Sequence, residues 1–353
     1  MRRIILSLIV LTFVLQPLLA SSDEKLKDEA AVLLKSGKAA EGYEKLKEYV
    51  RTEGKIDYSD YSLLAGIGLG LKKFDEARYF ANKALEVKPG DAPSLYVLGI
   101  LSQADGKNDE AIKFYNRVLT DGDKTDRSYG SMYIRALLQL GVCYTGKGNL
   151  EEANSYYKQV LAIEPWHELA NVYYGTNLIR EERWKEALSP LSKAYNKNHE
   201  RIEALGMFAM ALAQTDQFSP AVVNYKELIQ REPNNPNHYL NIARCLMMLS
   251  RLREAEKMMD KGLELAAKEG MTTELINYLG FAFRIYIEMG REDDAVKAFK
   301  DLKALNSEKA DEYYSDIIKQ WPHLEEKLNQ KESLAPVQGP IFAKEGDQSS
   351  EKL

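Results

Sequence analysis

Apolar residues recur through most of the chain with the spacing of amphipathic helices. One helix face is formed by positions i, i+3, i+4 and i+7, occupied by Leu137, Leu140, Gly141 and Tyr144. Gly148 then allows a turn into a second helix, and Pro165 ends that helix because it lacks an N–H donor. The pattern predicts a helical hairpin over residues 137–165.

The hairpin pattern returns at a nearly constant interval. Alanines of the second helices are separated by 34, 42, 34, 34, 34 and 40 residues, at Ala77, Ala111, Ala153, Ala187, Ala221, Ala255 and Ala295. A small residue lies 12 positions before most of these alanines, and a bulky side chain lies four positions after most of them. A single hairpin cannot bury its apolar faces, so we expect the hairpins to stack as one quasi-linear domain.

This pattern resembles the tetratricopeptide repeat (TPR). The resemblance implies an all-α fold, an α-solenoid of about eight TPR helical hairpins forming a right-handed superhelix. We expect the TPR array at residues 23–308, a C-terminal capping helix at 309–330 and a disordered tail at 331–353.

Three departures from the repeat predict local changes. Extra residues occur at 121–129 and 267–272, where we expect a longer helix or loop. The capping helix is expected to break at Trp321–Pro322. Phe283 occupies the position of a small residue, which predicts either wider helix spacing or a register shifted by one.

Residues 1–22 have the order of a secretory signal peptide. Arg2 and Arg3 precede an apolar run, and small residues end at Ser22. The run is shorter than the roughly 20 residues of a membrane span. Cleavage after Ala20 or after Ser22 and retention as an anchor are the alternatives. We expect a TPR protein of the exported bacterial type, periplasmic or secreted, without a stable membrane span after cleavage.

Composition excludes several classes of function. The 353 residues carry a net charge of −5, the wrong sign for a chain that binds nucleic acid through its phosphates. Cys143 and Cys245 occupy the same position of the fourth and seventh hairpins, too far apart for a disulfide, and are expected to be small buried fillers.

No motif predicts catalysis, a cofactor or a metal. The four histidines are widely separated and are expected to be solvated junction residues. Asp121, Asp123 and Asp126 lack the glycine and glutamate of a calcium loop and predict an acidic turn before a helix. Hairpins occupy nearly the whole chain, so we expect no enzyme.

In proteins with these repeats, the first helices line a concave groove. The resemblance places there the mainly apolar set Tyr96, Leu138, Val172, Ile179, Leu240 and Met247. Such a surface suits an extended or helical peptide. The carboxylate clamp of chaperone-binding relatives is not matched, because Lys27 is followed four residues later by Ala31.

Two consecutive hairpins add the same polar pair to this groove. Asn237 precedes Arg244 by seven residues, as Asn277 precedes Arg284, which places each pair on one helix face. The arginines are predicted to bind a carboxylate or acidic stretch of a partner. Alternatively they pair with local acids such as Glu288 and form an ordinary solvated surface.

Together these features predict a non-catalytic scaffold or adaptor of the cell envelope. It would bind a partner protein or peptide in the groove, as part of an envelope complex. The alternative is a periplasmic receptor that encloses a small molecule or lipid in the superhelix cavity.

Overall fold

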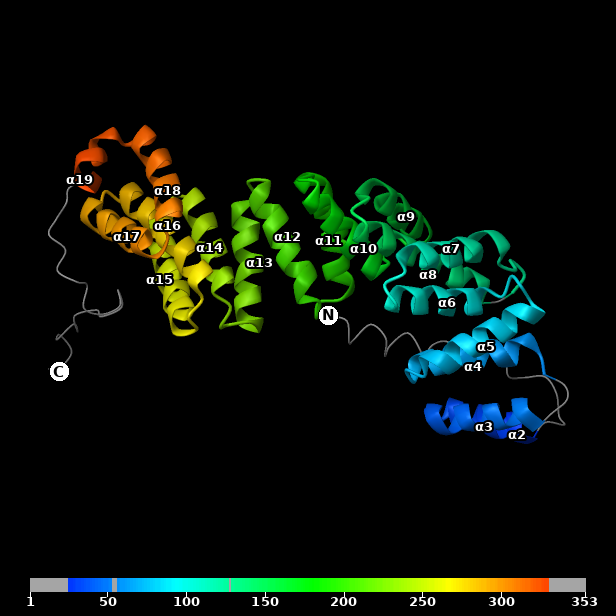
Figure 1. Ribbon diagram of the computed structural model, residues 1–353. Coiled ribbons are helices and arrows are strands. Elements are labelled where there is room, and N and C mark those ends of the chain that lie inside the picture. Colours follow the sequence, from blue (N-terminus) through cyan, green and yellow to red (C-terminus); the bar gives the residue numbers. More distant parts are fainter. Residues whose placement is uncertain (1–24, 53–55, 127, 330–353) are drawn as a thin grey trace. The chain divides into compact units, whose positions relative to one another are not determined.

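The computed structural model describes residues 25–52, 56–126 and 128–329. Within these ranges the chain forms eighteen α-helices, one short 3-10 helix and no strand (Figure 1). The predicted all-α fold of stacked helical hairpins is confirmed. The signal segment 1–22 and the tail 331–353 lie outside the described residues. No helix in the described ranges is both long and apolar enough to cross a membrane.

The helices form two compact units, Met1–Asn177 and Leu178–Leu353, where the sequence suggested one quasi-linear domain. The boundary lies inside α10, Glu168–Arg180. Every hairpin of a repeat array contacts mainly its neighbours, so a boundary requires neither a linker nor a change in composition. The repeat pattern therefore does not reveal the boundary between the two units.

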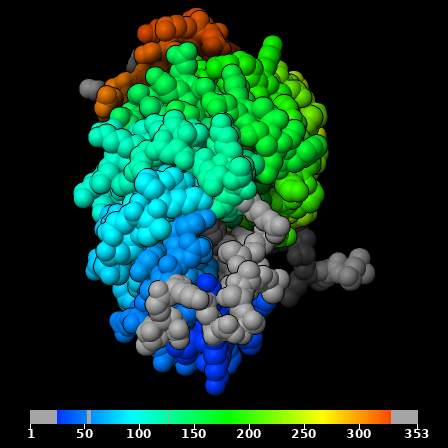
Figure 2. All heavy atoms as spheres, turned by 90° about the vertical axis from the view of Figure 1, so that its right-hand side faces the viewer, coloured from blue at the N-terminus to red at the C-terminus, as the bar shows by residue number. Residues whose placement is uncertain are grey.

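The first unit contains four complete hairpins. Neighbouring hairpins contact one another, and Figure 2 shows their atoms side by side in chain order from blue to teal. The helices are α2 (Lys25–Lys35), α3 (Ala39–Thr52), α4 (Tyr58–Gly70), α5 (Phe74–Val87), α6 (Ala92–Ala104), α7 (Asn108–Asp121), α8 (Tyr129–Gly146) and α9 (Leu150–Ile163).

The second unit contains the later hairpins and a terminal helical segment. Its helices are α11 (Trp184–Lys197), α12 (Ile202–Gln214), α13 (Phe218–Arg231), α14 (Pro236–Met248), α15 (Leu252–Lys268), α16 (Thr272–Glu288), α17 (Glu292–Leu305), α18 (Ser307–Gln320), η1 (Pro322–Leu324) and α19 (Glu325–Asn329). The chain turns at Trp321, because Pro322 cannot donate the hydrogen bond that would continue α18.

Each hairpin turn has one residue in the left-handed backbone region. These residues are Gly37, Lys72, Gly106, Gly148, Glu182, Asp216, Ser250 and Gly290. The predicted role of Gly148 is confirmed by its φ of 81°. Half of the turns, however, hold a residue with a β-carbon, at a φ between 57° and 61°. The turn geometry thus recurs without the glycine that favours it.

Glycines let the two helices of a hairpin approach closely. A β-carbon on Gly99 would lie 2.4 Å from Cε1 of Tyr115, and one on Gly141 would lie 2.4 Å from Cε1 of Tyr157. Both tyrosines are buried. In these two hairpins the recurring pair of small and bulky positions is therefore a contact between a glycine and a tyrosine ring.

The extra residues lengthen helices, as expected. α8 has 18 residues, and α15 and α16 have 17 each. At the irregular position of the eighth hairpin, the buried Phe283 ring lies 5.2 Å from the Phe299 ring at an interplanar angle of 38°. A pair of aromatic rings thus replaces the small residue beneath a bulky one.

Both cysteines are free and buried, which confirms the prediction of small fillers. Burial raises the pKa of Cys143 to about 11, and it raises that of Cys245 to about 11 as well. The Cys143 thiol also accepts a hydrogen bond of 3.1 Å from Nε2 of Gln103. Burial thus favours the neutral thiol over the reactive thiolate at both positions.

Candidate functional site

The acidic residues before α8 bond to their own loop. Oδ1 of Asp123 accepts hydrogen bonds from the backbone N–H of Thr125 at 2.9 Å and from its hydroxyl at 2.6 Å. Those bonds, with Lys88 Nζ 3.0 Å from Oδ2, lower the pKa of Asp123 to about 2. Asp126 bonds Ser128 in the same way. The carboxylates are satisfied by turn donors and a lysine.

The histidines have local structural partners. His238 Nε2 lies 2.7 Å from Oε2 of Glu232, and His323 Nε2 lies 3.2 Å from Oε1 of Glu292. His199 and His323 are exposed, whereas His167 and His238 are half-buried, so the expectation of solvated side chains is wrong for the latter two. Among the described residues, no group of three or more His, Cys, Asp or Glu side chains could hold a metal ion.

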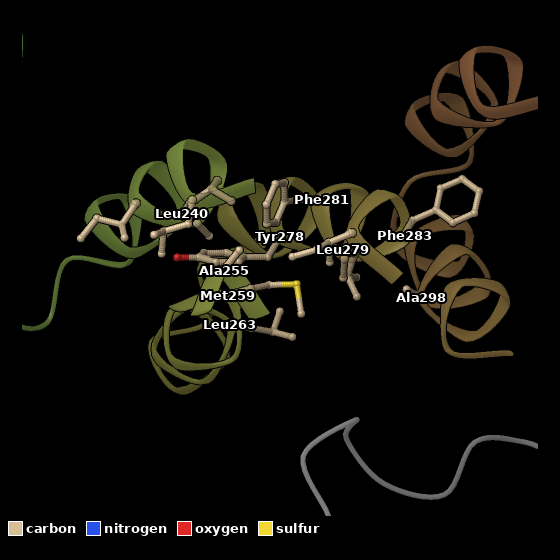
Figure 3. Close-up of a cluster of buried hydrophobic side chains, with 14 of the residues drawn as sticks. Leu240, Ala255, Met259, Leu263, Tyr278, Leu279, Phe281, Phe283 and Ala298 are labelled. Atoms are coloured by element: carbon tan, nitrogen blue, oxygen red, sulfur yellow. The ribbon is translucent and has the colours of Figure 1, made fainter. Parts of the chain in front are cut away.

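Tyr278 holds α14 and α16 together in the second unit. Its hydroxyl donates a hydrogen bond to the carbonyl of Pro236, at the start of α14. Figure 3 shows its ring among the buried side chains of α14, α15 and α16, with Leu240, Ala255 and Met259 nearby. This contact fixes the start of α14 relative to α16. These two helices carry the two predicted polar pairs.

The two predicted arginines lie on adjacent first helices. Arg244 is on α14 and Arg284 is on α16, two helices that contact each other. Both side chains are exposed, and neither makes a hydrogen bond or ion pair with any residue that the structure describes. Glu288, four residues beyond Arg284, forms no ion pair with it. The local pairing considered as the alternative is therefore absent from the described part of the chain.

The two predicted asparagines also have uncommitted side chains. Asn237 is exposed and Asn277 is half-buried. The backbone N–H of Asn237 donates to Oδ1 of Asn235, the residue that caps α14. Within residues 25–52, 56–126 and 128–329, neither side-chain amide makes a hydrogen bond. Each can offer donors and an acceptor to a peptide backbone.

Methionines supply the apolar part of this surface. Met248, at the end of α14, is 56% exposed, and Met247 is half-buried. Met210 on α12 is half-buried as well. We call the surface formed by Met247, Met248, Asn237, Arg244, Asn277 and Arg284 the arginine face. It combines flexible apolar side chains with guanidinium groups that make no ion pair with the residues described.

Four of the predicted groove residues are buried. Tyr96 is 3%, Leu138 6%, Val172 4% and Leu240 3% exposed, so the expectation that they present their side chains to a partner is wrong. All four occupy the same repeat position, where a first helix meets neighbouring hairpins. Tyr96, for example, shares a buried cluster with Met132 and Ala136 of the next hairpin. Its ring centroid lies 5.7 Å from that of Tyr115 in its own hairpin. Ile179 is half-buried on α10.

Sequence reasoning missed a buried polar network in the first unit. Nδ2 of Asn177 donates to Oγ1 of Thr145 at 3.0 Å and to Oδ1 of Asn154 at 3.1 Å. The Tyr157 hydroxyl lies 3.1 Å from the same Thr145 oxygen. Asparagines are common on helix surfaces, so nothing in the sequence distinguishes this pair. The network joins consecutive hairpins and has a structural role.

Comparison with known families supports the assignment of the repeats. Models described as tetratricopeptide repeat match residues 91–164 and 212–270. A crystal structure of the C-terminal part of a TPR repeat-containing protein from Cytophaga hutchinsonii matches with a TM-score of 0.57. It is 17% identical and covers 71% of this chain and 98% of that chain. That likeness concerns the fold.

Two curated relatives match shorter stretches. DnaJ protein P58IPK homolog B of rice (Oryza sativa subsp. japonica) is 30% identical over 118 residues, which are 32% of this chain and 24% of the rice protein. The photosystem I assembly protein Ycf3 of Rippkaea orientalis is 27% identical over 149 residues, 42% of this chain and 71% of that protein. This chain thus spans about a quarter of the rice relative.

TPR proteins generally act as scaffolds for protein interactions. The helical hairpins, their 34-residue period and the two matching repeat models all indicate that the chain is built from tetratricopeptide repeats. The chain is a tetratricopeptide repeat protein.

Proposed function

We propose that this protein is a non-catalytic adaptor that binds a partner protein or peptide through the arginine face. The observation that carries the proposal is that Arg244 and Arg284 are exposed on adjacent first helices without an ion pair to any described residue. The rice and cyanobacterial relatives, one named as a DnaJ protein and the other as an assembly protein, are consistent with an adaptor.

Most arginines of the same unit pair with acids, although the exposed Arg180 and Arg253 also lack an ion pair within the described ranges. Five of its arginines pair with carboxylates: Arg183, Arg201, Arg231, Arg251 and Arg291. Arg244 and Arg284, by contrast, donate to no acid in the described part of this acidic chain. A partner's carboxylate could therefore bind without first displacing an internal one.

We further propose that the adaptor works in the cell envelope. The order of charged, apolar and small residues in 1–22 supports export. Expression of the full chain, followed by fractionation and mass determination of the mature N-terminus, tests this proposal. Processing after Ala20 or Ser22 is expected, and an unprocessed cytoplasmic chain would contradict the location without affecting the binding proposal.

Capture from the native cells tests the binding face. The wild-type chain, an Arg244→Glu/Arg284→Glu variant and an Arg253→Glu control are each used as bait. Arg253 is also exposed and makes no ion pair within the described ranges, but it lies on the second helix α15. A specific protein should be retained by the wild type and the control and lost by the double variant.

The same capture distinguishes the small-molecule alternative. Mass spectrometry of the bait detects a lipid or other compound retained through purification. A compound retained by all three baits, with no protein that depends on the arginines, would replace the adaptor proposal by the receptor alternative. Retention of the same protein by all three baits would move the binding site away from the arginine face.

A further inference from the structure

Building on the proposed function, we propose the chemistry of the partner segment that binds the arginine face. It is an extended, internal segment with two side-chain carboxylates three residues apart and an apolar residue between them. The carboxylates bind Arg244 and Arg284, and the apolar residue packs on Met247 and Met248. The occupant is thus defined by charge, spacing and one hydrophobic contact.

Charge complementarity indicates that the partner segment is negatively charged. The chain as a whole carries −5, so a basic partner has many acidic surfaces available elsewhere. The arginine face is different, because two guanidinium groups on contacting helices have no acid bound to them among the described residues. Guanidinium binds carboxylate through two parallel hydrogen bonds, which makes a carboxylate the matching ligand group.

The repeat sets the spacing between the two charges. Arg244 and Arg284 occupy equivalent repeat positions on α14 and α16, whose helices contact each other and are joined by the Tyr278–Pro236 hydrogen bond. Neighbouring helices pack with axes roughly 8–10 Å apart. A polyproline II segment rises about 3.1 Å per residue with three residues per turn, so positions i and i+3 lie on one side about 9 Å apart. A segment of this pitch therefore places its two carboxylates at about the spacing expected for the axes of two neighbouring helices.

The other groups of the face suit the rest of an extended segment. Met248 is 56% exposed beside the half-buried Met247, and both can adapt to an apolar side chain. The amides of Asn237 and Asn277 make no hydrogen bond with described residues and face no competing partner there. Amides of this kind can bond the backbone of an extended peptide, which has no internal hydrogen bonds of its own.

Synthetic peptides test the proposal with the full chain. The probe is acetyl-Gly-Glu-Pro-Leu-Glu-Pro-Tyr-Gly-amide, in which both termini are uncharged. Its matched controls are the peptide with both glutamates replaced by glutamine and a peptide with the two glutamates adjacent. A further arm is the glutamine peptide with a free C-terminal carboxylate, which separates a terminal carboxylate from side-chain carboxylates. Binding is measured by titration calorimetry at low and high salt.

We expect the i, i+3 probe to bind most tightly and to weaken at high salt. Arg244→Glu and Arg284→Glu should each weaken it about fivefold or more, whereas Arg253→Glu should leave it unchanged. Equal binding of the glutamine peptide, equal binding of the adjacent-glutamate peptide, or tighter binding of the free C-terminus would overturn the inference. If those peptide results appear while native capture still depends on the arginines, the inference fails and the proposed function survives.

Discussion

Gly262 lies directly beneath the hydroxyl of Tyr278. A β-carbon on Gly262 would be 1.6 Å from that hydroxyl oxygen, which donates its hydrogen to the carbonyl of Pro236. A glycine on α15 thus permits a tyrosine of α16 to bond the start of α14. The position of the arginine face depends on this contact between three helices.

Gly262→Ala should destabilise the second unit and displace Tyr278. Overpacking of a core costs about 1–3 kcal/mol, and the hydrogen bond to Pro236 would be lost as well. The midpoint of urea unfolding, followed by circular dichroism, measures the effect. Gly206→Ala is the matched control, because the nearest atom to its new β-carbon is Cδ1 of Leu228 at 3.9 Å. That variant should gain up to about 1 kcal/mol from helix propensity. Equal effects of the two substitutions would show that Gly262 has no special packing role.

The hairpin turns offer a test of backbone conformation. Ser250 has a φ of 58°, and Gly290 has a φ of 69° at the equivalent turn of the next hairpin. The left-handed backbone conformation costs a residue with a β-carbon about 1–2 kcal/mol. Glycine avoids this cost, but it also makes the unfolded chain more flexible, which cancels part of the stabilisation. Ser250→Gly should therefore stabilise by roughly 0.5–1 kcal/mol and Gly290→Ala should destabilise by a similar amount, measured by urea unfolding. Ser250→Ala is the control and should change little. A loss of stability in Ser250→Gly contradicts the conformational explanation.

His167 should make the first unit sensitive to pH. Its Nδ1 accepts a hydrogen bond of 3.2 Å from the backbone N–H of Ala170, which caps the start of α10. Burial lowers the pKa of His167, against the opposing effect of Glu164. Because the folded pKa lies below the unfolded value of about 6.5, the stabilisation is complete above pH 6.5 and is lost as the pH falls through the folded pKa.

Replacing His167 by asparagine separates the cap from the titration. Asparagine is among the preferred helix caps and does not ionise. His167→Asn should keep the stability measured at pH 7.5 and reduce its decrease between pH 7 and pH 5, as followed by thermal unfolding across that range. An unchanged pH profile in this variant would show that other groups produce the decrease.

The arginine face should contribute little to folding stability. Arg244 and Arg284 are exposed and make no ion pair inside the described part of the chain, so charge reversal should change the free energy of unfolding by less than about 0.5 kcal/mol each. Urea unfolding of the single variants and of Arg253→Glu measures this. A larger loss would indicate that the arginines support the fold, and the loss of partner capture would then have a structural cause.

Much of the fold is predictable from the sequence because the repeat is local. The 34-residue interval reports hairpins whose two helices lie next to each other in the chain, and the lengthened α8, α15 and α16 follow from the extra residues. The candidate site is less predictable. The repeat position of Leu240 is correct, but its burial depends on Tyr278 and other residues of the neighbouring hairpin.

The sequence by itself determined the helical hairpins, their number and order, the two buried cysteines and the recurrence of an asparagine and an arginine on two first helices. These features depend on residues within one repeat length, where helix periodicity and turn chemistry act. Only the tertiary structure decided which groove residues remain exposed and that neither Arg284 nor Arg244 bonds a local acid such as Glu288. Exposure and ion pairing depend on the side chains that neighbouring hairpins bring into contact, and a repeat pattern does not specify those contacts.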